Sequence, residues 1–147
     1  MSEQEHRIVV GIDGSESSKA ALRWAIRQAK LTGASVDAVT AWRYPTGYGW
    51  APVSDGDLSV DLGYEAKKVL TEALGEVGGL EPEVLVHPQI AQGHPAEVLL
   101  RASKGADLLV LGSRGHGGFT SALIGSVSMY CVSHAHCPVL VLRDGQR

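Results

Sequence analysis

Two short, continuous runs of apolar residues constrain the fold of this chain more than any other feature of the sequence. They occupy residues 8–12 (IVVGI) and 108–111 (LLVL), and neither run alternates between apolar and polar side chains. Such runs are typical of strands that are buried on both faces, as in a parallel sheet covered by helices. Three further runs, at residues 38–42, 84–86 and 138–142, are expected to form the remaining strands.

Helical patterns fill the intervals between these runs. In the first interval, apolar residues recur at the spacing i, i+3, i+4 and i+7, serines precede them and Gly33 follows them. The apolar residues are Leu22, Ala25, Ile26 and Ala29, and the candidate N-caps are Ser15, Ser17 and Ser18. Further helices are predicted over about residues 61–77 and from Pro95 to Gly105. A last helix is predicted to hold Val127, Cys131 and His134 and to end before residue 137.

The alternation of strands and helices predicts an α/β domain with a Rossmann-like architecture. We expect a single doubly wound sheet of five parallel strands in the order 3-2-1-4-5, with helices on both faces. The 147 residues contain no internal repeat, so one domain is expected over residues 1–147, with its core at about 7–143. Residues 43–59 form a long connection of the kind that often covers a functional site.

The composition narrows the possible classes of function. The formal net charge is −3, which argues against a general nucleic-acid-binding surface. No apolar run approaches the ~20 residues needed to cross a bilayer, and the polar N-terminus lacks the apolar segment of a secretion signal. We therefore expect a cytoplasmic protein that binds neither nucleic acid nor membrane.

A glycine-rich segment after the fourth predicted strand carries the strongest functional signal. Four of the seven residues from 112 to 118 are glycines, and Gly125 and Ser126 follow at the start of the last helix. Glycine lets backbone N–H groups converge on an anion, and a helix beginning at Ser126 directs its free N–H groups and dipole toward the same place. Because the lysine of a P-loop and the spacing of a dinucleotide fingerprint are both missing, the remaining pattern is Gly-x2-Gly-x9-Gly-Ser.

This pattern is similar to the nucleotide-binding signature of the universal stress protein family, in its ATP-binding branch. Residues 8–18, 93–96 and 137–143 also resemble that family, and the resemblance extends over about residues 7–143. It implies an adenine nucleotide as ligand, with ATP first and ADP or AMP as alternatives, and Mg²⁺ as a companion of the phosphates. It implies no metal site of the protein's own, apart from a contact between Asp13 and nucleotide-bound Mg²⁺.

The resemblance also implies roles for individual residues. Asp13 matches an acidic residue that contacts ribose or the phosphate-bound metal, although the same side chain would suit a cap of the first helix. The residues that match the lining of the adenine pocket are Gly11, Ile12 and Ala41. Those that match the surroundings of ribose and phosphates are Gly112, Gly115, Gly125, Ser126 and Val127, with Ser113 and Arg114 at variable positions of the motif.

Three functions remain open from the sequence. The leading hypothesis is a regulatory module of the stress response that holds ATP and is not an enzyme. The alternatives are a slow ATP hydrolase of the same fold and a nucleotide-free, structural dimeric stress protein. Near the glycine-rich segment, His116 is the one obvious candidate for a general base, and no pair of nucleophile and base is apparent. The sequence therefore argues against rapid ATP hydrolysis.

A second copy of the chain is the expected protein partner. The apolar segment from Pro138 to Arg143 is predicted to form the edge strand of the sheet, and an unprotected apolar edge favours pairing with another strand. The family resemblance implies a homodimer through the same segment. Cys131 and Cys137 are too few for a disulfide framework.

Overall fold

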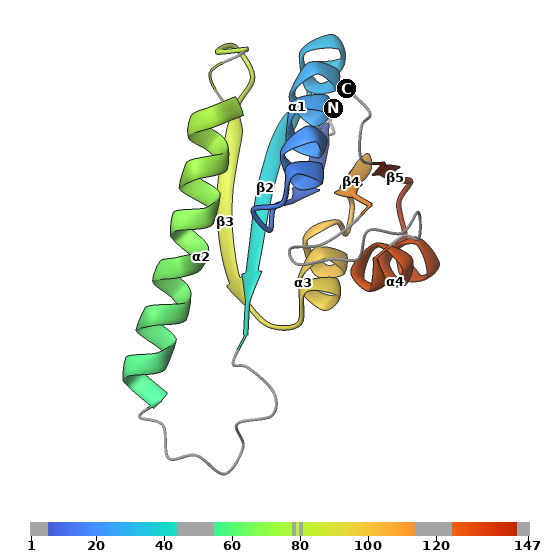
Figure 1. Ribbon diagram of the computed structural model, residues 1–147. Coiled ribbons are helices and arrows are strands. Elements are labelled where there is room, and N and C mark those ends of the chain that lie inside the picture. Colours follow the sequence, from blue (N-terminus) through green and yellow to red (C-terminus); the bar gives the residue numbers. More distant parts are fainter. Residues whose placement is uncertain (1–5, 44–54, 78, 80, 114–124, 144–147) are drawn as a thin grey trace, which may run out of the picture.

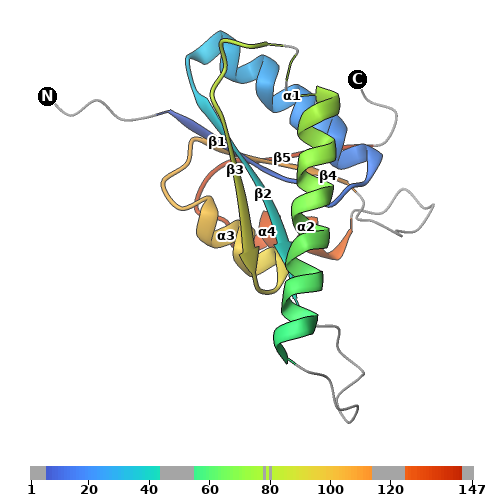
Figure 2. The same ribbon diagram turned by 90° about the vertical axis from the view of Figure 1, so that its left-hand side faces the viewer.

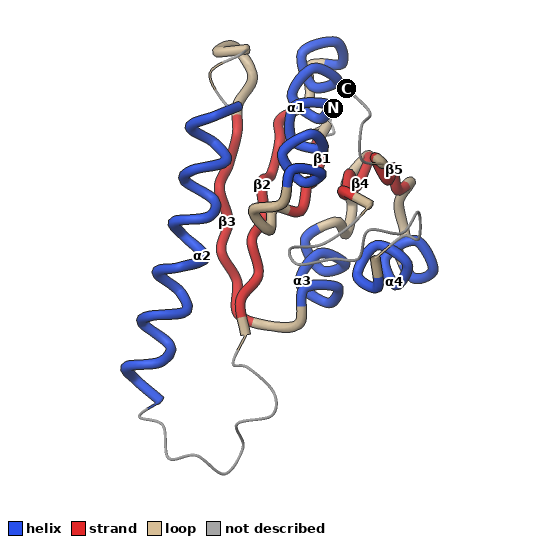
Figure 3. The backbone as a smooth tube through the Cα atoms, viewed as in Figure 1, coloured by secondary structure: helices blue, strands red, loops and turns tan. Residues whose placement is uncertain are grey.

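A parallel sheet of five strands forms the centre of the computed structural model, which describes residues 6–43, 55–77, 79, 81–113 and 125–143 (Figure 1). The strands lie in the order β3-β2-β1-β4-β5, which confirms the predicted doubly wound topology. Strands and helices alternate along the chain (Figure 3). In chain order they are β1 (Arg7–Gly11), α1 (Glu16–Thr32), β2 (Ser35–Trp42), α2 (Asp55–Val77), β3 (Val86–Gln92), α3 (Pro95–Ala102), β4 (Leu108–Gly112), α4 (Ser126–His134) and β5 (Val139–Leu142).

Helices cover both faces of the sheet, as the continuous apolar runs predicted. Ile8 and Val10 of β1 pack with residues of α1 and α2, whereas Val9 packs on the opposite face with residues of α3 and α4. Successive side chains of a strand point to opposite faces, and helices cover both faces here. Val9 and Val10 are therefore both fully buried. In Figures 1 and 2, the first turns of α2 extend beyond the carboxyl ends of β2 and β3.

The sequence signals at the two ends of α1 act as predicted. Ser15 is the N-cap, and its Oγ accepts a 3.2 Å hydrogen bond from the N–H of Ser18. Gly33 ends the helix with φ of +79°, and its N–H donates to the carbonyl of Ala29. The four apolar residues of the predicted helical stripe are all buried.

The prediction for the third strand was wrong in its position. β3 spans Val86–Gln92, whereas the apolar run at residues 84–86 mostly precedes it. β3 is an edge strand and five of its seven residues are exposed, so it needs no continuous apolar sequence. It also accommodates Pro88, because an edge strand tolerates the loss of a backbone donor.

Two helix boundaries also differ from the predictions. α2 begins at Asp55, so part of the predicted long connection, residues 55–59, is helical. Residues 44–54 of that connection lie outside the described residues. α3 ends at Ala102 with Ser103 as its C-cap, before Gly105, because the next N–H, that of Lys104, donates to the carbonyl of Arg101 and no longer follows the i→i−4 pattern.

Candidate functional site

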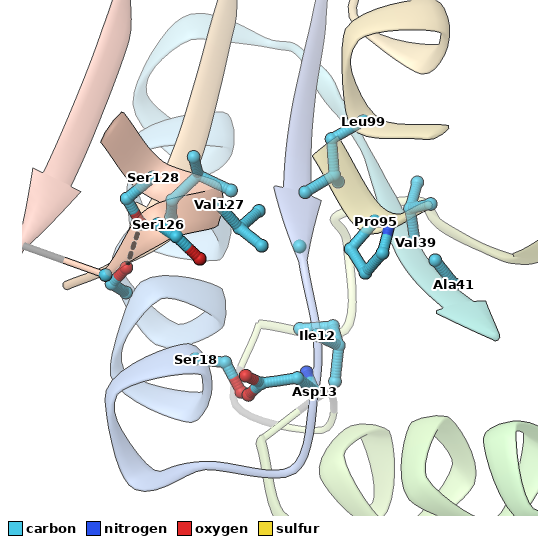
Figure 4. A pocket seen from close by; sticks show the side chains of 14 residues that line it. Ile12, Asp13, Ser18, Val39, Ala41, Pro95, Leu99, Ser126, Val127 and Ser128 are labelled. Carbon is cyan, nitrogen blue, oxygen red and sulfur yellow. Dashed lines mark hydrogen bonds between the residues drawn. The ribbon is translucent and has the colours of Figure 1, made fainter. Parts of the chain in front are cut away.

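A pocket of about 170 Å³ lies at the carboxyl ends of β1 and β4, where the strand order reverses. This is the position at which doubly wound sheets bind ligands. Figure 4 shows the side chains that surround it, contributed by the strand ends, by α3 and by the first turns of α1 and α4. The lining residues are Gly11, Ile12, Asp13, Ser18, Val39, Ala41, Pro95, Leu99, Leu111, Gly112, Gly125, Ser126, Val127 and Ser128.

A network of short hydrogen bonds fixes the carboxylate of Asp13 at the rim of the pocket. Its Oδ1 accepts a 2.9 Å bond from the N–H of Ser15 and a 2.6 Å bond from Ser15 Oγ. Ser18 Oγ donates to the carbonyl of Ser15 and accepts a 3.3 Å bond from the N–H of Asp13. One reading of the sequence made Asp13 the cap of the first helix. In the structure Ser15 is the cap, and Asp13 orients it.

One side of the pocket is apolar. Val39 and Ala41 of β2 and Pro95 and Leu99 of α3 line it, and Figure 4 shows Pro95 and Leu99 on the same side of β1 as Val39 and Ala41. Gly11 forms part of the floor, where a Cβ would lie 3.1 Å from a methyl group of Leu99. An apolar slot bounded by backbone suits a flat, heteroaromatic base.

The opposite side of the pocket is formed by the start of α4. The helix begins at Ser126, as predicted, and its N-cap Gly125 makes no side-chain capping hydrogen bond. Two bonds fix this start to the end of β4: Gly125 N–H donates to the Ser113 carbonyl at 2.6 Å, and Ser128 Oγ donates to the Gly112 carbonyl at 2.7 Å. The first N–H groups of a helix without a side-chain cap attract an anion.

The structure brings most of the predicted site residues together. Those that line the pocket are Gly11, Ile12, Asp13, Ala41, Gly112, Gly125, Ser126 and Val127. Ser113 is buried and does not line the pocket; its N–H donates instead to the carbonyl of Leu142 at 2.7 Å. Arg114 and Gly115 lie outside the described residues.

Several residues of the pocket were not predicted from the sequence. They are Ser18, Val39, Pro95, Leu99, Leu111 and Ser128. Pro95 lies within the family-like stretch at residues 93–96, which was a usable signal. The others had no distinguishing motif. Val39 and Leu111 lie on β2 and β4, and Ser18, Leu99 and Ser128 reach the pocket through the packing of α1, α3 and α4 against the strands.

The charges of the pocket are sparse. Among the lining residues that the structure describes, Asp13 is the only acidic one, and none is Lys, Arg or His. The hydroxyls of Ser18, Ser126 and Ser128 supply the other polar side chains. The pocket thus combines an apolar slot, a fixed carboxylate and the amino end of a helix.

Comparison with known proteins identifies the family. A family model described as Universal stress protein family matches residues 5–143. The chain belongs to that family. Universal stress protein Rv1996 of Mycobacterium tuberculosis is 35% identical over 145 residues, which cover 95% of this chain and 44% of the relative. The chain thus spans less than half the length of that family member.

Two other family members are similar over nearly their whole length. A universal stress protein of Thermus aquaticus is 36% identical over 138 residues, covering 92% of this chain and 97% of the relative. A solved universal stress protein in complex with cAMP is 26% identical with a TM-score of 0.71, covering 95% of this chain and 98% of that chain. These relatives confirm the family resemblance that the glycine pattern suggested.

The remaining features of interest lie outside the pocket. Within the described ranges, no helix is long and apolar enough to span a bilayer, and no three His, Cys, Asp or Glu side chains are grouped to hold a metal. Cys131 is buried in the core, and the ring of His134 stacks on that of Tyr130 with centroids 4.1 Å apart.

Proposed function

We propose that this universal stress protein binds an adenine nucleotide, with ATP as the leading ligand, and acts as a regulatory module of a stress response. The pocket at the ends of β1 and β4 is the binding site in this proposal. The base occupies the apolar slot between β2 and α3, and the phosphates approach the amino end of α4. Asp13 contacts the ribose or a Mg²⁺ ion carried by the phosphates.

The observation that carries this proposal is the start of α4. Gly125 makes no side-chain capping bond, and Gly125, Ser126 and Val127 all line the pocket. An anion at this point would accept from backbone N–H groups and interact favourably with the helix dipole. Charge-assisted hydrogen bonds of this kind are worth roughly 1.5–3 kcal/mol each.

The similarity to the cAMP-bound family member supports an adenine nucleotide as the class of ligand. We favour ATP because the chain retains the full Gly-x2-Gly-x9-Gly-Ser pattern from Gly112 to Ser126. The two sequence-based alternatives, a slow ATP hydrolase and a nucleotide-free structural dimer, are less favoured. The described pocket residues include no Lys, His or Cys that would serve as a general base or strong nucleophile.

We further propose that two copies associate through β5 and the outer face of α4. β5 is an edge strand, and each of its four residues is partly exposed. Beside it in the chain, Met129, Tyr130 and Val132 of α4 are each roughly half exposed, which is unusual for large apolar side chains gathered on one short helix. A partner strand added to this edge would satisfy the unpaired backbone groups and cover the apolar side chains.

The test of nucleotide binding uses two variants of α4 that change the net charge equally. Ser126→Glu places a carboxylate at the amino end of the helix, where it favours the helix dipole but repels phosphate. Ser133→Glu places the same charge on an exposed position near the other end of α4. Calorimetry with Mg·ATP is expected to show micromolar binding by the wild type, a similar affinity for Ser133→Glu, and an affinity at least tenfold lower for Ser126→Glu.

Equal affinity of the two charge variants would overturn the placement of the phosphates. Failure of the wild type to bind ATP, ADP, AMP or cAMP would overturn the proposal as a whole. Gly115→Val is expected from the sequence pattern to abolish binding as well, with an unchanged helical circular-dichroism signal.

A further inference from the structure

We propose that His94 is a positioning residue for the pocket: its neutral imidazole caps α3 and thereby holds Pro95 and Leu99 in place, so that protonation of His94 weakens ligand binding. The inference rests on the proposed nucleotide-binding function and names a regulatory input to the same site. It concerns a residue that does not itself line the pocket.

The cap has a geometry that requires a neutral ring. His94 has the extended backbone of an N-cap, with φ of −62° and ψ of 132°, and its Nδ1 accepts a 3.1 Å hydrogen bond from the N–H of Ala96. An imidazole nitrogen accepts a hydrogen bond only through a free lone pair. The proton of this histidine is therefore on Nε2, and Nδ1 is the acceptor.

The first turn of α3 depends strongly on this one acceptor. Pro95 at the first helical position has no N–H, so Ala96 is the first residue of the helix whose donor needs a partner. The helix has only eight residues, and short helices are marginal without favourable ends and packing. Loss of the cap therefore affects a large share of this element.

The turn before α3 is fixed by contacts of Gly93, so loss of the cap would be expected to affect the first turn of the helix. Gly93 N–H donates a 2.8 Å bond to the carbonyl of Trp42 at the end of β2, and Gly93 has φ of +147°. A Cβ on Gly93 would lie 3.1 Å from a methyl group of Val98, so the turn packs closely on α3. The β3–α3 connection is thus fixed on the β2 side, while the His94 ring fixes it on the helix side.

The pocket depends on the helix that His94 caps. Pro95 and Leu99 of α3 line the apolar slot, and both side chains lie beside the end of β1 in Figure 4. A helix whose first turn frays presents these two side chains in several positions. The slot that suits a flat base then exists for only part of the time, and the apparent affinity falls by that fraction.

Protonation converts the acceptor into a donor and adds a positive charge at the positive end of the helix dipole. Glu97 in the first turn attracts an imidazolium, but it is exposed and such a pair is weak in water. Arg7 and Asp37 bind each other, and Arg7 donates to the Ala102 carbonyl at the opposite end of α3. Among the described residues, the charged or titratable groups on α3, on the elements packed against it and across the pocket are Glu97, Arg101, Arg7, Asp37, Tyr130, Cys131, His134 and Asp13.

The test compares the wild type with His94→Asn between pH 7.5 and pH 5.5. Asparagine is among the best N-cap residues and does not titrate, so it preserves the cap at both pH values. Calorimetry with Mg·ATP is expected to show that the wild type loses about fivefold more affinity than His94→Asn on acidification, a ratio equivalent to about 1 kcal/mol. Protonation of ATP itself changes the affinity of both proteins equally, so this effect cancels in the ratio. His94→Ala is expected to bind more weakly than His94→Asn at both pH values.

A second readout does not depend on the ligand. Amide hydrogen exchange at Ala96, corrected for the intrinsic effect of pH, is expected to be faster at pH 5.5 in the wild type and unchanged in His94→Asn. Identical pH profiles of affinity and exchange in the two proteins would overturn the inference, as would tighter binding by the wild type at low pH. If neither protein bound any adenine nucleotide at pH 7.5, the proposed function would fail, and the exchange data would still decide whether His94 is a pH-dependent cap.

Discussion

A Cβ atom on Gly112 would lie 2.7 Å from the carbonyl carbon of Ser17, closer than real Cβ atoms approach other heavy atoms. Gly112 ends β4, and Ser17 is the second residue of α1, so the two elements meet where only a glycine fits. The sequence pattern assigned this glycine to the ligand. The structure adds that the packing of α1 on β4 requires it in any case.

Gly112→Ala is therefore expected to destabilise the fold even without ligand. Overpacking of a close contact costs typically 1–3 kcal/mol, to be measured as the free energy of unfolding in urea. Gly75→Ala is the matched control, because Gly75 lies within α2 and an added Cβ meets nothing within 4 Å. We expect the control to stabilise the protein by up to about 1 kcal/mol. Equal stabilities of the two variants would show that α1 shifts freely away from β4.

Asp13→Ala and Asp13→Asn are expected to separate structure from ligand binding. Alanine removes both hydrogen bonds from Ser15 to Asp13 Oδ1 and should lower the free energy of unfolding by about 1 kcal/mol. Asparagine retains an oxygen acceptor and should lower it less. Both variants lose the carboxylate, so both should bind Mg·ATP more weakly by calorimetry. A normal affinity of Asp13→Asn would remove the carboxylate from the binding site.

Arg7→Met is expected to be destabilising. Arg7 donates to Asp37 Oδ2 at 3.0 Å and to the carbonyls of Ala102 and Lys104, and Asp37 is only 5% exposed. Removing Arg7 leaves the buried Asp37 carboxylate without this partner. Because the Arg7 side chain is 26% exposed, the expected loss in the free energy of unfolding is below the value for a fully buried pair, at about 1–3 kcal/mol. The double variant Arg7→Met/Asp37→Leu should recover much of this loss in urea denaturation. An unchanged stability of the single variant would contradict the buried role of this pair.

The two cysteines are expected to differ in their reactivity. Burial raises the pKa of Cys131 from 9.0 to about 11, and the nearby Cys137 adds to this effect. Burial also raises the pKa of Cys137, but Ser103 and Arg7 oppose this rise and the residue is only partly buried. Since only the thiolate reacts with iodoacetamide, mass spectrometry of the native protein at pH 8 should show Cys137 modified well before Cys131. Labelling of Cys131 first would indicate that α4 opens readily.

Val141→Lys is expected to weaken the proposed self-association by at least tenfold. A lysine on an edge strand opposes pairing with another strand. Leu31→Lys is the control, because Leu31 is 81% exposed on α1, which is not part of the proposed interface. Sedimentation velocity should show wild type and Leu31→Lys as dimers and Val141→Lys as a monomer. A monomeric wild type at tens of micromolar would rule out this interface.

The sequence by itself determined the order of strands and helices, and much of their ends. Continuous apolar runs identified β1 and β4, and local signals such as Ser15, Gly33 and Pro95 placed helix ends, because capping depends on residues within one turn. The glycine spacing from Gly112 to Ser126 indicated the end of the sheet that carries the pocket. β3 was misplaced because an edge strand needs no apolar run.

Only the tertiary structure decided how the residues of the pocket meet. The sequence left Asp13 as a helix cap, a ligand contact or both. The bonds from Ser15 show that it orients the cap, and its side chain lines the pocket. Leu99 and Ser128 carry no motif, and they reach the pocket because α3 and α4 pack against the ends of β1 and β4. Contacts between segments far apart in the chain depend on how the helices pack on the sheet, and no local pattern of residues determines that packing.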